Sequence, residues 1–97
     1  MKIPDKVKIG GIIYDIEIKN CNNNILTEDK LWGNIDFGEG KIYLNGGIEK
    51  QILEQVFFHE VLHGIEHDYC LNLKDTDIDR ISHGITAFLK DNNLLKD

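Results

Sequence analysis

The sequence predicts an α+β protein, in which a small antiparallel sheet of two N-terminal hairpins is followed by two packed α-helices. Short runs that alternate apolar and polar residues fill the first half, and glycine-rich turns interrupt them. Two longer stretches of the second half carry helical periodicity. A chain of 97 residues buries only about 60–65% of its unfolded surface, which supports one core and a single domain over residues 1–97.

Both predicted hairpins lie before residue 46. The first is folded at Gly10-Gly11, and apolar residues recur with a period of two along its second strand, at Ile12, Tyr14, Ile16 and Ile18. The second joins Trp32–Phe37 to Lys41–Leu44 through Gly38-Glu39-Gly40, whose glycines allow the positive φ that a tight turn needs. The intervening residues are predicted to be a polar loop followed by a stretch that fits no element clearly.

Two helices are predicted in the second half, over about Ile48–Tyr69 and about Thr76–Lys90. The first is apolar nearly all round, so we expect it to be central and buried. The second is amphipathic, and we expect its apolar stripe to face the core. That stripe consists of Ile78, Ile81, Ile85, Phe88 and Leu89.

The first helix contains the pattern H-E-x-x-H at His59-Glu60-Val61-Leu62-His63. Its two histidines lie one helical turn apart on one face, so both imidazoles can reach one Zn²⁺ at about 2.0–2.1 Å. Glu60, beside the first histidine, can then act as general base toward a water on the metal. Buried without partners, these groups would cost several kcal/mol. The plainer alternative is that the histidines are ordinary core or rim residues and Glu60 pairs with a lysine.

A catalytic zinc usually has a third protein ligand. The second helix offers Asp75, Asp77 and Asp79 in its first turns, where acids also complement the helix dipole. Asp77 lies about 70° from the centre of the apolar stripe, closer than the other two, which predicts Asp77 as the ligand. Asp75 and Asp79 stay open as alternatives.

The other two histidines are poorer ligand candidates. His67 lies about 12 Å along the helix axis from His59, so we expect it to be solvated or to support the site from outside. His83 is expected to face solvent. Either histidine, or Tyr43 or Tyr69, could stabilise an oxyanion, and the sequence does not choose among them.

With these motifs the chain resembles zinc-dependent metallopeptidases of the HExxH class in their small, gluzincin-like form. It is more similar still to short phage and mobile-element proteins related to the ImmA/IrrE family. The resemblance rests on Leu31–Phe37, Ile42–Leu44, His59–Gly64 and Asp77–Ser82. It implies a minimal zincin-like fold and a third ligand from the next helix, which by motif position is Asp77. The family commonly has glutamate there, and its larger members carry a sensor or DNA-binding domain that this chain lacks.

The expected function is hydrolysis of a peptide bond by zinc-activated water, with His59, His63 and Asp77 holding Zn²⁺ and Glu60 as the base. Lys41–Leu44 is predicted to be an edge strand along which an extended substrate docks. The resemblance suggests a cytosolic regulatory protein, such as a repressor, as substrate. The alternative is a catalytically inactive zinc-binding structural or interaction protein of phage or mobile-element origin.

Composition excludes several other classes. Seventeen acidic residues against eleven basic ones, a net charge of −6, weigh against a nucleic-acid partner. A helix-turn-helix DNA binder is disfavoured by the long loop between the helices and by the acidic second helix. No apolar run is long enough for a membrane span and no signal peptide is evident. We therefore expect a cytoplasmic protein, in the host cytosol if phage-encoded, with Cys21 and Cys70 as free thiols.

Overall fold

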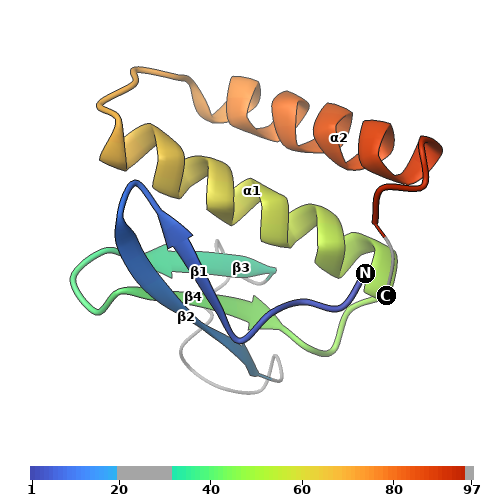
Figure 1. The fold of residues 1–97 in the computed structure, drawn as a ribbon, viewed down its shortest axis with the longest axis horizontal. Coiled ribbons are helices and arrows are strands. Elements are labelled where there is room, and N and C mark those ends of the chain that lie inside the picture. The colour runs from blue at the N-terminus through green and yellow to red at the C-terminus, as the bar shows by residue number, and fades with distance from the viewer. Residues whose placement is uncertain (20–31, 96–97) are drawn as a thin grey trace.

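The chain folds into a four-stranded sheet with two helices stacked on one side of it (Figure 1). The computed structural model describes residues 1–19 and 32–95, so the polar loop predicted over residues 20–24 and the unassigned stretch 25–31 lie outside it. The α+β class and the order of strands and helices agree with the sequence prediction. The elements are β1 (Lys6–Ile9), β2 (Ile12–Lys19), β3 (Gly33–Asp36), β4 (Lys41–Asn45), α1 (Lys50–Asp68) and α2 (Asp75–Asp91).

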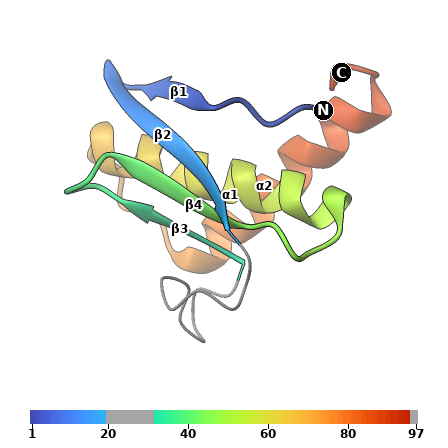
Figure 2. The ribbon, with the colours of Figure 1, turned by 90° about the horizontal axis from the view of Figure 1, so that it is seen from below.

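The strand order is β1-β2-β4-β3 (Figure 2). Both predicted hairpins are present as antiparallel pairs, but β2 and β4 run parallel, so the sheet is mixed and not wholly antiparallel. The prediction of Lys41–Leu44 as an edge strand is wrong, because β4 lies between β2 and β3. Its consecutive residues Ile42, Tyr43 and Leu44 are 0%, 6% and 0% exposed. A strand with neighbours on both sides and both faces covered needs such a continuous apolar run.

The first hairpin is fixed against the C-terminal end of α1. Gly10 and Gly11 form its turn with φ of 58° and 85°, as predicted. A Cβ on Gly10 would lie 2.8 Å from the Cβ of Asp68, so the turn approaches the helix closely. The buried Tyr14 hydroxyl donates a hydrogen bond to the Asp68 carboxylate, 3.2 Å from Oδ2. This contact sets where the end of α1 lies on the sheet.

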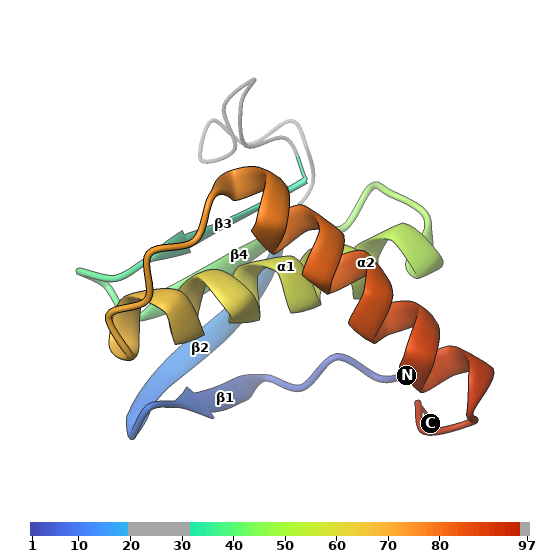
Figure 3. The same ribbon diagram turned by 90° about the horizontal axis from the view of Figure 1, so that it is seen from above.

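Helix α1 forms the central layer, between the sheet and α2 (Figures 1 and 3). Val56, Phe57, Glu60 and Gly64 are its buried residues over the sheet, which confirms the predicted central position. At Gly64 the helix comes so close that a Cβ would lie 2.9 Å from the Cδ1 of Ile9. Neither helix in the described part of the chain is long and apolar enough to cross a membrane.

Helix α2 packs on α1 through a different face from the predicted one. Its buried residues are Ile78, Ser82 and Thr86, whereas Ile81 and Ile85 are each 39% exposed. Since successive residues turn by about 100°, the centre of the buried face lies near Ser82, about 70° from the predicted centre. Ser82 accepts a hydrogen bond from the Gln55 side chain of α1 at 3.0 Å, which fixes this orientation.

Candidate metal centre

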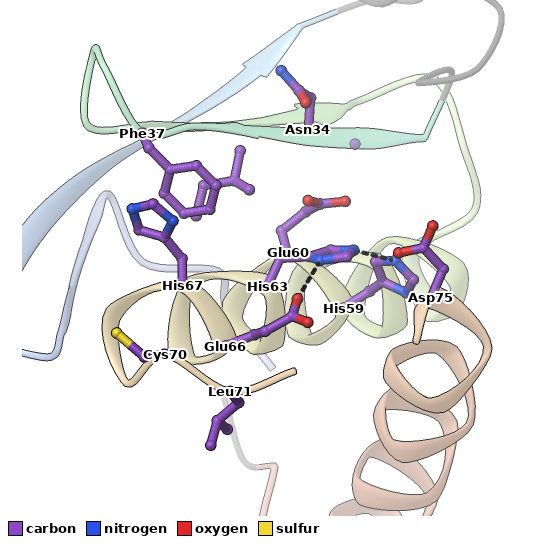
Figure 4. Close-up of a pocket in the computed structure, with 12 residues that line it drawn as sticks. Asn34, Phe37, His59, Glu60, His63, Glu66, His67, Cys70, Leu71 and Asp75 are labelled. Carbon is purple, nitrogen blue, oxygen red and sulfur yellow. Dashed lines mark hydrogen bonds and ion pairs between the residues drawn. The ribbon is translucent and has the colours of Figure 1, made fainter. Parts of the chain in front are cut away.

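A pocket of about 710 Å³ opens between β3 and the second half of α1, beside the first residue of α2 (Figure 4). Its volume is within the range of small-ligand sites, about 300–1,000 Å³. The predicted residues His59, Glu60 and His63 all line it. The full lining is Gly33, Asn34, Ile35, Phe37, His59, Glu60, His63, Glu66, His67, Cys70, Leu71 and Asp75.

The two histidines point their Nε2 atoms at each other. These atoms are 3.1 Å apart, and the ring planes are inclined by 64°. Two nitrogens bound to one tetrahedral Zn²⁺ at about 2.0–2.1 Å lie about 3.3–3.4 Å apart. The observed separation is therefore close to what two ligands of one ion require. Helical spacing alone accounts for it, because His59 and His63 lie one turn apart on the rim of α1 between the sheet and α2.

Each histidine turns its other ring nitrogen toward a carboxylate. His59 Nδ1 lies 3.6 Å from Asp79 Oδ1, and His63 Nδ1 lies 3.5 Å from Glu66 Oε1. Metal-binding histidines commonly have a carboxylate at this nitrogen, which fixes the tautomer and the direction of the ring. The sequence reasoning missed Glu66, although its position three residues after His63 in a helix was a usable signal.

The environment favours the neutral form of His59. Burial lowers the pKa of this imidazole most, and the neighbouring His63 lowers it further. Asp79 and Asp75 act in the opposite direction without reversing the shift. A neutral imidazole is the form that binds a metal, so the pKa of His59 is shifted in the direction that a ligand needs.

Glu60 lies beneath β3 and is only 7% exposed. Its side chain lies close to the backbone of Gly33. A Cβ on Gly33 would lie 3.3 Å from Glu60 Cγ and Oε2, so a larger residue there would crowd Glu60. The same Cβ would lie 2.7 Å from Val56 Cγ1. Gly33 is thus a second residue that the sequence reasoning missed. A glycine inside a predicted strand marks a close approach of this kind.

The acids of α2 are placed differently from one another. Asp75 lines the pocket, and in Figure 4 it lies beside His59. Asp79 contacts His59 and also lies 3.6 Å from His83 Nε2. Asp77 is partly buried but is not among the residues lining the pocket. Asp77 was predicted from a buried face of α2 that differs from the observed one, and its role as a ligand stays a prediction that this geometry does not support.

The end of the pocket away from Asp75 is built around an aromatic pair. The His67 ring stacks on Phe37 with 3.8 Å between centroids and 18° between planes, as Figure 4 shows. His67 therefore forms part of the pocket wall. Cys70 and Leu71 continue this wall, and Cys70 is an exposed free cysteine, whereas Cys21 lies outside the described residues.

The donor set suits Zn²⁺ but is not assembled around one point. Within residues 1–19 and 32–95, no three His, Cys, Asp or Glu side chains form a group ready to hold a metal. Two imidazole nitrogens do converge, and an aspartate from α2 adjoins them. Two nitrogens and one carboxylate oxygen are a donor set of catalytic zinc. Comparison of the chain with protein-family models, curated proteins and solved structures found no match.

Proposed function

We propose that this protein is a zinc-dependent peptidase whose active site is the pocket between β3 and α1. The observation that supports this most is the convergence of the His59 and His63 Nε2 atoms, 3.1 Å apart, in the same pocket as Glu60. A hydrogen bond between two neutral imidazoles would give the same separation, and the zinc measurement below distinguishes it from a metal site. We place the protein in the cytoplasm, as its cysteine usage suggested.

In this proposal His59 and His63 hold the zinc, which, when bound, polarises the scissile carbonyl as a Lewis acid. Glu60 accepts a proton from the attacking water and delivers it to the departing amide nitrogen. Its side chain lies against Gly33 of β3, where any larger residue would crowd it. Asp79 and Glu66 orient the imidazoles of His59 and His63, respectively, through their Nδ1 atoms.

For the third ligand the geometry favours Asp75 over Asp77. Asp75 lines the pocket, and its charge acts on His59. Asp79 already faces the far nitrogen of His59, a position suited to orienting the ring rather than to ligation. We therefore assign the ligand role to Asp75 and the orienting role to Asp79.

The substrate in this proposal is a protein or peptide segment in extended conformation. β3 is at the edge of the sheet formed by the described strands, and Gly33, Asn34 and Ile35 from it line the pocket. An extended chain can add to such an edge through main-chain hydrogen bonds, which brings one of its peptide bonds over the histidines. This moves the docking role from the predicted Lys41–Leu44 to β3.

Zinc content and cleavage of a peptide library, measured together, test the proposal. We expect about one zinc per chain and cleavage in the unmutated protein, and neither in His63→Ala. Glu60→Gln should keep the zinc and lose at least 100-fold in activity, because general-base catalysis contributes about 10²–10⁴-fold. Glu49→Gln, an exposed glutamate next to α1, is the matched control. Zinc without any cleavage in the unmutated protein would instead favour the inactive, zinc-binding alternative.

Alanine replacement of each α2 acid tests the ligand assignment. Chelator competition should show the largest loss of zinc affinity for Asp75→Ala and a loss of about 10–100-fold for Asp79→Ala. Asp77→Ala should bind zinc like the unmutated protein. If Asp77→Ala had the largest effect instead, the ligand would be the one predicted from sequence.

A further inference from the structure

Helix α2 carries an apolar stripe that the described part of the chain covers only in part. Ile81 and Ile85 are each 39% exposed and Phe88 is 59% exposed. The same helix buries Ser82 and Thr86 against α1, and Ser82, at the centre of that buried face, lies about 90° around the axis from the exposed stripe. The helix is therefore strongly amphipathic, and part of its apolar side is exposed beside the face that packs on α1. An amphipathic helix with an exposed apolar side is typical of one that packs on a partner.

Gly84 lies within this stripe, one position before Ile85. A Cβ added there would meet no atom within 4 Å, so the fold of the chain itself does not require a glycine. Gly in the middle of a helix costs about 1 kcal/mol relative to alanine. A small residue between large apolar ones does, however, let a second helix approach closely.

The charged residues beside the stripe indicate which helix could pack on it. Taking about 100° per residue, Arg80 and Asp91 lie on the same flank of the stripe, about 20° apart around the axis. Both are exposed. They are eleven residues apart, so their midpoint falls next to Ile85, near the centre of the stripe.

This arrangement has the symmetry of an antiparallel pair of identical helices. When two copies of a helix pack antiparallel, each flank of one helix faces the same flank of the other. A residue N-terminal to the midpoint of one helix then lies opposite a residue C-terminal to the midpoint of its partner. Arg80 of one copy then faces Asp91 of the second, and the same contact occurs twice. In a parallel pair, the flank that carries Arg80 and Asp91 would instead face the partner's other flank, which α1 covers.

We propose that two copies of this chain associate through α2, packed antiparallel about Ile85, with Arg80 of each facing Asp91 of the other. The contact is small, so the dimer should form in the micromolar range of concentration. The paired face lies about 90° around α2 from the face that packs on α1, and Asp75, which lines the pocket, lies on the α1 side of the helix. This proposal does not depend on the proposed peptidase activity.

Sedimentation equilibrium of the full chain across the micromolar range tests the proposal. The mass should rise from one chain toward two. Ile85→Asp should keep the mass at one chain at every concentration, with its fold verified by circular dichroism. His83→Asp, on the opposite side of α2, introduces the same side chain and should dimerise like the unmutated protein. A protein that stays monomeric throughout, or a dimer that Ile85→Asp leaves intact, would overturn the proposal.

Charge exchange tests the antiparallel geometry. Arg80→Asp and Asp91→Arg should each weaken the dimer by roughly tenfold, because each places like charges in contact twice. The double variant restores opposite charges and should recover most of the loss. A double variant weaker than both single variants would overturn the pairing of Arg80 with Asp91.

Discussion

At the scale of single residues, Glu66 links the candidate metal centre to the loop between the helices. Its Oε1 lies 3.5 Å from His63 Nδ1, and its Oε2 accepts a hydrogen bond from the Leu73 backbone N–H at 3.0 Å. A carboxylate can serve both neighbours because it offers two acceptor oxygens. Glu66 thus holds the loop that leads into α2 and also orients the ring of His63, a proposed zinc ligand.

Glu66→Gln separates these two roles. In glutamine an NH2 donor replaces one of the two carboxylate oxygens, so one of the two contacts, with Leu73 N–H or with His63 Nδ1, loses its acceptor. We expect zinc affinity, measured by chelator competition, to fall about 10–100-fold, as for other groups that orient metal-binding histidines. The melting temperature of the metal-free protein should change little. Unchanged zinc affinity together with a lower melting temperature would show that Glu66 only holds the loop.

At the scale of secondary-structure elements, the sequence predicted the features that periodicity and turn residues determine, which are the hairpins and the helices. It did not predict the features that depend on tertiary contacts, which are the strand order and the buried face of α2. Both hairpins and both helices were found, and His59, Glu60 and His63 were correctly brought together. The parallel pairing of β2 with β4 was missed, because hairpin patterns do not say which strands meet. The three buried residues Ile42, Tyr43 and Leu44 were the available signal for an interior strand.

The buried face of α2 was missed for a specific reason. The prediction assumed that the most apolar side of the helix faces the core, since burying a polar group without a hydrogen bond is costly. Ser82 and Thr86 avoid this cost within their own helix. The Ser82 hydroxyl donates to the Asp79 carbonyl at 2.8 Å, and the Thr86 hydroxyl donates to the Ser82 carbonyl at 2.6 Å. The error then carried over to the choice of Asp77.

Ile78 and Ile81, three residues apart on α2, provide a matched test of this orientation. Ile78 is fully buried and Ile81 is 39% exposed. We expect Ile78→Ala to lower the free energy of unfolding by about 2–5 kcal/mol. Ile81→Ala should lower it by less than about 1 kcal/mol. Urea denaturation should be measured at protein concentrations low enough to keep the chain monomeric. Equal losses would mean that α2 packs on the predicted stripe after all.

At the scale of the whole molecule, Glu54 connects both ends of the chain to the central helix. This buried side chain on α1 lies 2.8 Å from the amino group of Met1 and 3.2 Å from Lys90 Nζ near the end of α2. The N-terminal segment and the last turn of α2 are therefore held against the same point. The contact lies far from the pocket, so it acts on stability and not on the proposed chemistry.

The ionisation of Glu54 should make this contribution depend on pH. Burial acts to raise the pKa of this carboxyl, but the Met1 amino group and Lys90 outweigh it, and the net pKa lies below the ordinary value of 4.5. A lowered pKa in the folded state means that the stabilisation is complete above pH 4.5 and is lost as the pH falls through the folded-state pKa. Glu54→Gln should cost about 1.5–3 kcal/mol at neutral pH.

Urea unfolding of the unmutated protein and of Glu54→Gln at a series of pH values measures this directly. The difference in unfolding free energy between the two should be constant above pH 4.5 and should shrink below it, because Glu54 becomes protonated while glutamine does not titrate. Glu49→Gln, whose glutamate is exposed, should show no comparable difference at any pH. A difference for Glu54→Gln that stays constant down to the acid unfolding transition would mean that burial of the side chain, and not its charge, provides the stabilisation.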